Sequence, residues 1–213
     1  MFIKICGITR LQDALLAAEL GAHALGYNFY PKSKRYLPPA HAAQIHAQVR
    51  ARYPHIIGAG IFVNASLADM QTILAECGLD WAQCHGDEPE EVLAALGNRG
   101  LKAVRAASLE EARGGLQRFG CRENPPALLL DAAIPGEYGG SGQRADWNIA
   151  AALAQEAAIL LAGGLTPQNV AQAVSHVHPW GVDVASGVES APGIKNPNAL
   201  RVFIHNANSH QKD

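Results

Sequence analysis

The sequence lacks any apolar run that approaches the ~18 residues needed for a membrane-spanning helix. It also lacks a basic N-terminal region followed by an apolar signal core, since Met1 leads directly into a short apolar stretch. Neither export nor membrane insertion is therefore predicted, and the cytoplasm is the expected location. Cysteine is scarce, with four residues and no C-x-x-C pair. This spacing predicts reduced thiols rather than a disulfide framework or a metal centre.

The chain has no large excess of either charge, because its formal net charge is -2 at pH 7. No broad surface for nucleic acid is therefore expected, and an anionic ligand has to be attracted by local groups. Hydrophobic residues make up 48% of the 213 residues and charged residues 17%, which argues against a disordered or fibrous chain. A chain of this length fits one large core, so we expect a single domain.

Short apolar runs alternate with helical patterns along the whole chain. The expected strands are residues 2–6, 24–29, 56–63, 79–84, 101–105, 127–130, 157–162 and 180–184. The expected helices are residues 11–20, 40–52, 66–77, 90–96, one starting after Ser108, 147–155, one starting at Thr166, and 197–206. Eight strand–helix units predict a single-domain (β/α)8 TIM barrel, whose size range begins near ~200 residues. An open doubly wound sheet is the alternative, but no G-x-G-x-x-G follows the first strand.

Three helix starts carry recognisable caps. Thr9 is expected to cap the first helix, and Ser108 with Glu111 forms a capping box for the fifth. Thr166 and Pro167 predict a capped start with proline in the first turn. The segment 114–126, rich in glycine and charge, is longer than a compact connection needs, and the sequence assigns it no function.

In a barrel the carboxyl ends of all strands open on one face, so the polar residues that follow the strands should converge there. These residues are Cys6, Arg35, Asn64, His85, Asp131, Gly163 with Gly164, and Ser186 with Gly187. Glycine-rich exits from the last two strands, each followed by a helix start, predict a phosphate site. The basic loop 30–39 carries Arg35, whose guanidinium can form two parallel hydrogen bonds to a carboxylate.

The alternation of side chains along the first strand predicts an ion pair inside the barrel. If Cys6 points into the barrel, Lys4 does too, where an unpaired ammonium would be expensive. Asp183 occupies a matching inward position of the last strand and is the expected partner.

Motifs in a fixed order cover nearly the whole chain. They are K-I-C-G-I-T at 4–9, G-Y-N-F-Y-P-K-S-K-R-Y at 26–36, I-F-V-N at 61–64, H-G-D-E at 85–88, L-L-D at 129–131, G-G-S-G at 139–142, A-G-G-L-T-P at 162–167 and D-V-A-S-G-V-E-S-A-P-G-I-K at 183–195. In this combination the chain resembles the phosphoribosylanthranilate isomerase family of tryptophan biosynthesis.

The resemblance implies an Amadori rearrangement, in which the phosphoribosyl amine of anthranilate opens to a Schiff base and isomerises to a 1-deoxyribulose 5-phosphate derivative. It implies Asp131 as general acid and Cys6 as general base, with no cofactor and no metal. Such chemistry needs a carboxyl group that keeps its proton and a thiol that loses its proton more readily than a free thiol. Arg35 would face the anthranilate carboxylate.

The remaining expectations concern the rest of the substrate and the partners. Gly163, Gly164, Ser186 and Gly187 are expected at the phosphate, and His85 and Asp183 are further candidate substrate-binding residues. A small phosphorylated molecule is the expected partner, without nucleic acid or membrane, and the chain is expected to be a monomer or a homodimer.

Other interpretations remain at this point. Cys6 can be an inert buried thiol, since free cysteine is among the most buried residue types. An indole-glycerol-phosphate synthase would need a lysine acid at a strand end, and the histidine-pathway isomerase an aspartate after the first strand with a twofold repeat; neither pattern is found. A phosphate-binding barrel without catalysis would keep the last two strand exits but need not keep Cys6 and Asp131.

Overall fold

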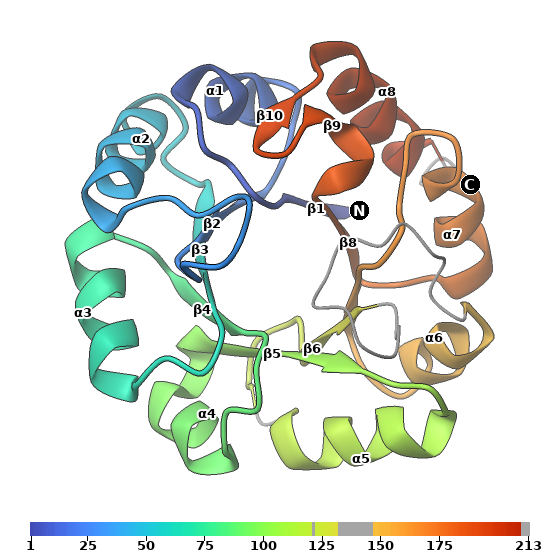
Figure 1. Ribbon diagram of the computed structural model, residues 1–213. Helices are drawn as coiled ribbons and strands as arrows, with labels where there is room; N and C mark the ends of the chain where they lie inside the picture. The colour runs from blue at the N-terminus through green and yellow to red at the C-terminus, as the bar shows by residue number, and fades with distance from the viewer. Residues whose placement is uncertain (121, 132–146, 210–213) are drawn as a thin grey trace.

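The computed structural model describes residues 1–120, 122–131 and 147–209. In this part of the chain, parallel strands close into a barrel in chain order (Figure 1). The strands are β1 (Phe2–Ile5), β2 (Ala24–Asn28), β3 (Ile57–Phe62), β4 (Trp81–Cys84), β5 (Gly100–Arg105), β6 (Leu128–Asp131), β7 (Ile159–Leu161) and β8 (Gly181–Val184). The (β/α)8 barrel predicted from the sequence is confirmed.

A ring of helices surrounds the strands, as the view along the barrel axis shows (Figure 1). They are α1 (Leu11–Glu19), α2 (Pro39–Arg52), α3 (Leu67–Cys77), α4 (Glu90–Leu96), α5 (Leu109–Phe119), α6 (Trp147–Ala154), α7 (Val170–Val177) and α8 (Pro197–Asn208). Short elements complete the fold: η1 (Gly97–Arg99), η2 (Ser186–Val188), and a hairpin of β9 (Glu189–Ala191) and β10 (Ile194–Lys195). No described helix is long and apolar enough to span a membrane.

Strand alternation divides the apolar residues into two groups. The larger group fills the space between the sheet and the helices, whereas the smaller lies inside the barrel. The interior group consists of Ala59, Trp81, Leu101, Ala103, Leu129, Leu160 and Ala162, with Phe2, Ile57 and Trp180 packed against it. The Phe2 ring lies between two tryptophans, with centroid distances of 4.3 Å to Trp180 and 5.8 Å to Trp81. Because these rings come from the beginnings of their strands, they fill the end of the barrel at which the strands begin.

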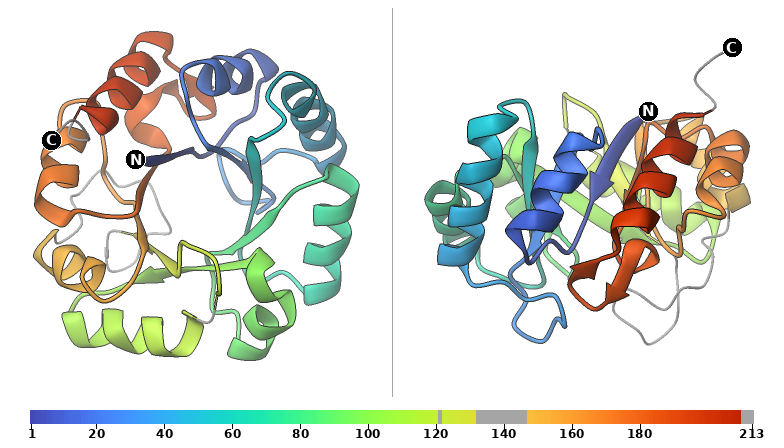
Figure 2. Two further views of the ribbon diagram at one scale, coloured as in Figure 1. Left: turned by 180° about the vertical axis from the view of Figure 1, so that it is seen from behind. Right: turned by 90° about the horizontal axis from the view of Figure 1, so that it is seen from above.

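The polar strand exits lie at the opposite end of the barrel. In the side view, the loop after β2 and the β9–β10 hairpin project from the same end, away from the N-terminus (Figure 2). The sequence analysis did not predict this hairpin, because it assigned residues 189–195 to no strand or helix. It matters for the site, since it brings Glu189 and Lys195 back over the end of β1.

Of the three predicted helix caps, that of Ser108 is confirmed and the other two are wrong, although α1 begins at Leu11 as predicted. The Ser108 hydroxyl accepts from the N–H of Glu111, and the Glu111 carboxylate accepts from the N–H of Ala107. Thr9 does not cap α1, because its hydroxyl donates to the carbonyl of Gly193 in the hairpin. The helix predicted after strand seven begins at Val170 instead of Thr166, since the Asn169 side chain accepts from the Thr166 N–H and closes a separate turn.

The glycine-rich segment 114–126 is partly helical, because α5 continues through Phe119. Gly115 faces the sheet, and a Cβ at this position would lie 2.7 Å from the Cγ1 of Val104. The absence of a side chain at Gly115 therefore lets α5 approach β5 closely.

His46 is a buried titratable residue on the outer side of the barrel. Its Nδ1 lies 3.3 Å from the Tyr27 hydroxyl, and both side chains are almost completely buried. Burial, with a smaller contribution from Arg50, lowers the pKa of His46 from 6.5 to about 4. His46 is therefore neutral in the folded protein at physiological pH.

This pKa predicts a measurable loss of stability in acid. Between pH 6.5 and about 4 the unfolded chain binds a proton that the folded protein excludes, so the free energy of unfolding falls as the pH is lowered through this window. Urea unfolding of His46→Gln should show a shallower decrease across the same range. His41→Gln, an exposed position on the same helix, is the control and should keep the original slope. Equal slopes for His46→Gln and the unaltered protein would contradict the assignment.

Candidate active site

A cavity of about 730 Å³ opens at the carboxyl ends of the strands. Its wall includes every site residue predicted from the sequence, namely Cys6, Arg35, His85, Asp131, Gly163, Gly164, Asp183, Ser186 and Gly187. Among the described residues, four cationic side chains line it, those of Lys32, Lys34, Arg35 and Arg105, against the carboxylates of Asp131 and Asp183. The cavity is thus suited to an anionic ligand although the whole chain is slightly acidic. No cluster of three or more potential metal ligands occurs in the described ranges.

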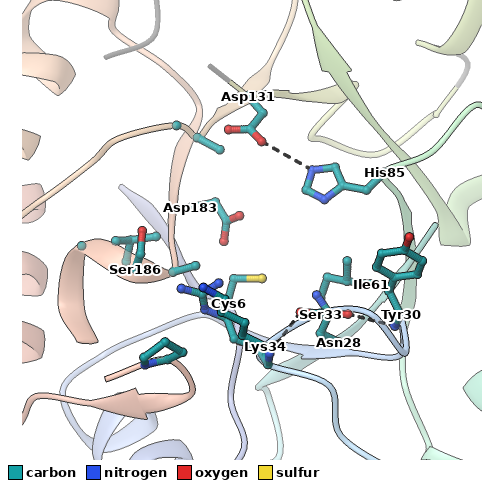
Figure 3. A pocket seen from close by; sticks show the side chains of 18 of the residues that line it. Cys6, Asn28, Tyr30, Ser33, Lys34, Ile61, His85, Asp131, Asp183 and Ser186 are labelled. Atoms are coloured by element: carbon teal, nitrogen blue, oxygen red, sulfur yellow. Dashed lines mark hydrogen bonds and ion pairs between the residues drawn. The ribbon is translucent and has the colours of Figure 1, made fainter. Parts of the chain in front are cut away.

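Cys6 lies directly after β1, and its thiol points into the cavity (Figure 3). The neighbouring strand makes room for it at Gly26, where a Cβ would lie 2.9 Å from the Cys6 Sγ and 3.1 Å from the Cys6 Cα. Sequence reasoning treated Gly26 as an ordinary strand residue. Its position inside the G-Y-N-F-Y motif was a signal, because a glycine within a strand often marks a close approach.

Lys4 lies one layer below Cys6 and is completely buried. It is the register partner of Asp183 across the β1–β8 closure, and its Nζ lies 2.9 Å from the Asp183 Oδ1. The ion pair predicted from strand alternation is confirmed. Burial alone would lower the pKa of Lys4, but the attraction of Asp183 and Cys6 more than offsets it, so that the pKa is raised. Lys4 therefore remains an ammonium.

The thiol of Cys6 is not acidified in this arrangement. Burial raises its pKa above the ordinary value; Lys4 and Lys195 lower it, and Asp183 raises it. The expectation that Cys6 loses its proton more readily than a free thiol is therefore wrong for these surroundings. Lys4 is the strongest influence that favours the thiolate.

His85 and Asp131 approach each other across the cavity (Figure 3). The His85 Nε2 lies 3.9 Å from the Asp131 Oδ2. Burial, followed by the charges of Arg105, Lys4 and Lys102, lowers the pKa of His85 to about 3. His85 is thus a neutral imidazole at physiological pH, and its contact with Asp131 is not an ion pair.

A buried carboxylate braces the loop that carries His85. The Glu88 side chain accepts from the backbone N–H groups of Asn64 and Gly86 and lies 2.7 Å from the Lys102 Nζ. The Asn64 Oδ1 accepts from the N–H of Asp87 at 2.7 Å. Asn64 was expected among the converging residues, but it is absent from the described cavity wall and instead ties the exit of β3 to that of β4.

The glycine-rich exits of β7 and β8 lie side by side. Gly163 and Gly164 have φ angles of 91° and 64°, which favour glycine. A Cβ on Gly187 would overlap the carbonyl oxygen of Leu165, so the two exits touch directly. The predicted helix start after β7 is wrong, because α7 begins at Val170. The helix start predicted after β8 is confirmed, since α8 begins at Pro197, but the short turn η2 and the hairpin separate it from Ser186 and Gly187. The phosphate site therefore stays a prediction, and its hydrogen-bond donors would be backbone N–H groups of the loops and not those of a helix N-terminus.

Arg35 lies over Gly7, where a Cβ would lie 2.6 Å from the Arg35 Cδ. Two of its nitrogens are engaged by Glu189, with Nε at 2.9 Å and Nη2 at 2.7 Å from the carboxylate oxygens. This contact raises the pKa of Arg35. The Nε and Nη2 edge of the guanidinium therefore makes its two parallel hydrogen bonds to Glu189. The sequence had suggested such a pair of bonds for a ligand. Sequence reasoning missed Glu189, although it belongs to the motif that also contains Ser186 and Gly187.

Comparison with known proteins agrees with this geometry. A sequence model of the family described as N-(5'phosphoribosyl)anthranilate (PRA) isomerase matches residues 3–206. The chain belongs to the phosphoribosylanthranilate isomerase family. It is an isomerase of tryptophan biosynthesis, as the resemblance of the motifs implied.

Relatives match over nearly the full length of the chain. The N-(5'-phosphoribosyl)anthranilate isomerase of Myxococcus xanthus is 47% identical over 208 residues, covering 97% of this chain and 96% of that protein. The phosphoribosyl anthranilate isomerase of Thermotoga maritima has a TM-score of 0.87 at 36% identity, with 97% and 98% of the two chains covered. Another solved isomerase structure, with a TM-score of 0.83 at 35% identity and the same coverages, is a complex with reduced 1-(o-carboxyphenylamino)-1-deoxyribulose 5-phosphate.

The charge environment of this isomerase predicts how Cys6 responds to loss of Lys4. In Lys4→Met the ammonium disappears while the Asp183 carboxylate remains, so the pKa of Cys6 should rise further and its alkylation by iodoacetamide should slow at each pH. Peptide mass spectrometry across a pH series measures this for Cys6 alone. Lys32→Met, at an exposed position of the cavity wall, should leave the profile unchanged. A Cys6 pKa that stays constant or falls in Lys4→Met would refute the prediction.

The close approach at Gly26 predicts a second effect on the isomerase. Because one of the atoms that the added Cβ meets in Gly26→Ala is the Cys6 Cα, the end of β1 must shift. We expect kcat to fall by about tenfold or more, since a small displacement of a reacting group is costly. Gly114→Ala is the matched control, because a Cβ there meets nothing within 4 Å. Steady-state assays measure kcat of both variants. Equal kcat values for Gly26→Ala and Gly114→Ala would contradict the prediction and show that the site tolerates the shift.

Proposed function

We propose that Asp131 is the general acid and Cys6 the general base of the Amadori rearrangement that converts N-(5-phosphoribosyl)anthranilate into 1-(2-carboxyphenylamino)-1-deoxyribulose 5-phosphate. The observation that carries this proposal is the placement of both side chains, from the ends of β6 and β1, in the wall of one cavity (Figure 3). A carboxyl group and a thiol can each exchange a proton with the substrate without a cofactor.

Two proton transfers lead from the substrate to an enolamine, and tautomerisation then gives the product. In the first, Asp131 gives a proton to the furanose ring oxygen, the C1–O bond breaks, and the nitrogen lone pair forms the C=N bond of a Schiff base. In the second, Cys6 as thiolate takes the proton from C2, and the electrons of that bond move toward the nitrogen to give an enolamine. C1 then takes up a proton while the hydroxyl on C2 gives up its own, which converts the enolamine into the ketone. The two groups act on different atoms, which fits their positions on separate strands.

The state of the thiol sets a pH dependence. Only the thiolate can remove the C2 proton, and burial raises the pKa of Cys6 above its ordinary value. The thiolate fraction is therefore small near neutral pH and increases with pH. Lys4, held by Asp183 and directly below Cys6 on the same strand, is the cation that stabilises it.

Groups for both charged ends of the substrate occur in the wall of the cavity. The loop after β2 supplies Arg35, a partner for the anthranilate carboxylate, while Gly163, Gly164, Ser186 and Gly187 form the proposed phosphate site. His85 and Asp183, in the same wall, are the proposed partners of the ribose hydroxyls. The relative solved with the reduced deoxyribulose 5-phosphate compound supports a ligand of this size and charge.

We propose further that the enzyme acts in the cytoplasm, on a small-molecule substrate and without nucleic acid, as a monomer or homodimer. A reducing compartment keeps Cys6 as a free thiol, which the proposed mechanism needs. The isomerase from Thermotoga maritima is described as dimeric. Sedimentation analysis of this chain distinguishes the two assemblies.

The division of labour between Cys6 and Asp131 can be tested step by step. Each of Cys6→Ala and Asp131→Asn should lower turnover by about 100-fold or more, the usual scale of general acid–base catalysis. Cys6→Ala should still open the ring, so borohydride should trap a Schiff base, whereas exchange of the C2 proton with deuterium should disappear. Asp131→Asn should yield no trapped open-chain species. The assay follows the loss of substrate fluorescence.

Cys77→Ala provides the control, because Cys77 lies at the end of α3 and is not among the described residues that line the cavity. Its turnover should equal that of the unaltered enzyme. Near-native activity of Cys6→Ala would refute the base assignment, and a trapped Schiff base with Asp131→Asn would refute the acid assignment.

A further inference from the structure

Glu189 is a buried carboxylate next to the cavity to which the proposed mechanism gives no role. It begins the β9–β10 hairpin, and only 4% of its side chain is exposed. Its two oxygens together accept from the Arg35 Nε and Nη2, from the Lys195 Nζ at 3.0 Å and from the Gly193 N–H at 3.3 Å. Burial disfavours the carboxylate, but the hydrogen bonds from Arg35 and the charge of Lys195 more than offset this and lower the pKa of Glu189. Glu189 is therefore ionised.

The pairing of Glu189 with Arg35 is directional. Glu189 occupies the edge of the guanidinium formed by Nε and Nη2, at distances between 2.7 and 3.1 Å. The third nitrogen, Nη1, makes no hydrogen bond to any described residue. Arg35 also lies against Gly7, so its side chain cannot retreat toward β1. The guanidinium is thus held in one orientation, with the Nη1 end left for a ligand in the cavity that Arg35 lines.

Lys195 extends this arrangement to the strand ends. Its Nζ donates to the Cys6 carbonyl at 2.6 Å and to the Ala185 carbonyl at 3.1 Å, as well as to Glu189. The side chain is almost completely buried. The carbonyls belong to the residues that follow β1 and β8, so a single ammonium joins both exits to the carboxylate that holds Arg35.

We propose that Glu189, supported by Lys195, is a positioning residue that fixes the guanidinium of Arg35 for end-on recognition of the substrate's aromatic carboxylate. The proposal rests on the proposed function, in which Arg35 receives that carboxylate. It assigns Glu189 to substrate specificity, since its effect reaches only ligands that carry the carboxylate. Glu189 touches Arg35 and not the substrate.

The charge of Glu189 and its positioning of Arg35 predict opposite changes in KM when Glu189 is replaced by glutamine. The substrate carries a carboxylate and a phosphate, so a nearby Glu189 carboxylate repels it. If Glu189 mattered only through its charge, Glu189→Gln would lower KM. If Glu189 positions Arg35, the same change frees the guanidinium and raises KM despite the more favourable charge.

The experiment measures KM and kcat for Glu189→Gln and Glu189→Asp. We expect KM to rise by about tenfold or more in both, the scale of one charged hydrogen bond, with kcat changed by less than about threefold. Glu189→Asp keeps the charge and shortens the reach, so it remains informative if the glutamine variant folds poorly. N-(5-phosphoribosyl)aniline, which lacks the carboxylate, should show no change in KM with either variant.

Two control variants distinguish the positioning role of Glu189 from the carboxylate-binding role of Arg35. Glu156→Gln removes the carboxylate of an exposed pair with Arg113 that has the same two-pronged geometry, and it should leave KM unchanged. Arg35→Ala should raise KM for the natural substrate, and adding Glu189→Gln to it should raise KM no further.

The outcomes distinguish the ideas. A raised KM in Arg35→Ala with unchanged or lowered KM in both Glu189 variants would overturn the positioning role and leave the proposed function standing. An equal rise for the aniline analogue would overturn it as well, because the effect would then act through Lys195 and the strand ends. An unchanged KM in Arg35→Ala would instead overturn the proposed carboxylate site itself.

Discussion

The interior of this barrel depends on the ion pair between Lys4 and Asp183. The two residues are register partners at the point where the first and last strands close the barrel, and Lys4 has no exposure to solvent. A buried ammonium without a partner is expensive, and breaking such a pair typically costs ~3–5 kcal/mol. A register slip of one residue in β1 would turn Lys4 toward the apolar shell and leave Asp183 inside, so the pair also favours one closure over its alternatives. The thiol of Cys6 is therefore delivered to a defined place above a defined charge.

A second buried series of charges serves the rim of the same face. Lys195, Glu189 and Arg35 follow one another with alternating sign, and the carbonyls of Cys6 and Ala185 take the remaining donors of Lys195. Each ion in this series has an opposite charge beside it, which offsets the cost of its burial. The cationic side chains of the cavity wall, by contrast, outnumber its carboxylates. Arg35 belongs to both groups, because Glu189 holds it and it also lines the cavity.

Glycines decide how closely these charged groups approach the backbone. Gly26 leaves space for the Cys6 thiol, Gly7 accommodates the Arg35 side chain, and Gly187 packs on the Leu165 carbonyl. At each of these positions a Cβ would come closer than 3.0 Å to a neighbouring atom. The residues at the active-site face are therefore closely packed although many of them lie in loops. Small side-chain changes there act directly on the positions of reacting groups.

Sequence patterns alone predict the barrel, the strand that carries each site residue and the partner of Lys4. These follow from local patterns, because apolar periodicity sets the elements and alternation within a strand sets which side chains share a face. The tertiary structure decided what depends on contacts between distant segments. The Thr9 hydroxyl binds the carbonyl of Gly193 instead of capping α1, and the hairpin places Glu189 against Arg35. The pKa of Cys6 is raised because the effect of burial exceeds that of its cationic neighbours. No local pattern encodes those outcomes, since each is a balance of desolvation and distance that exists only once the chain has closed.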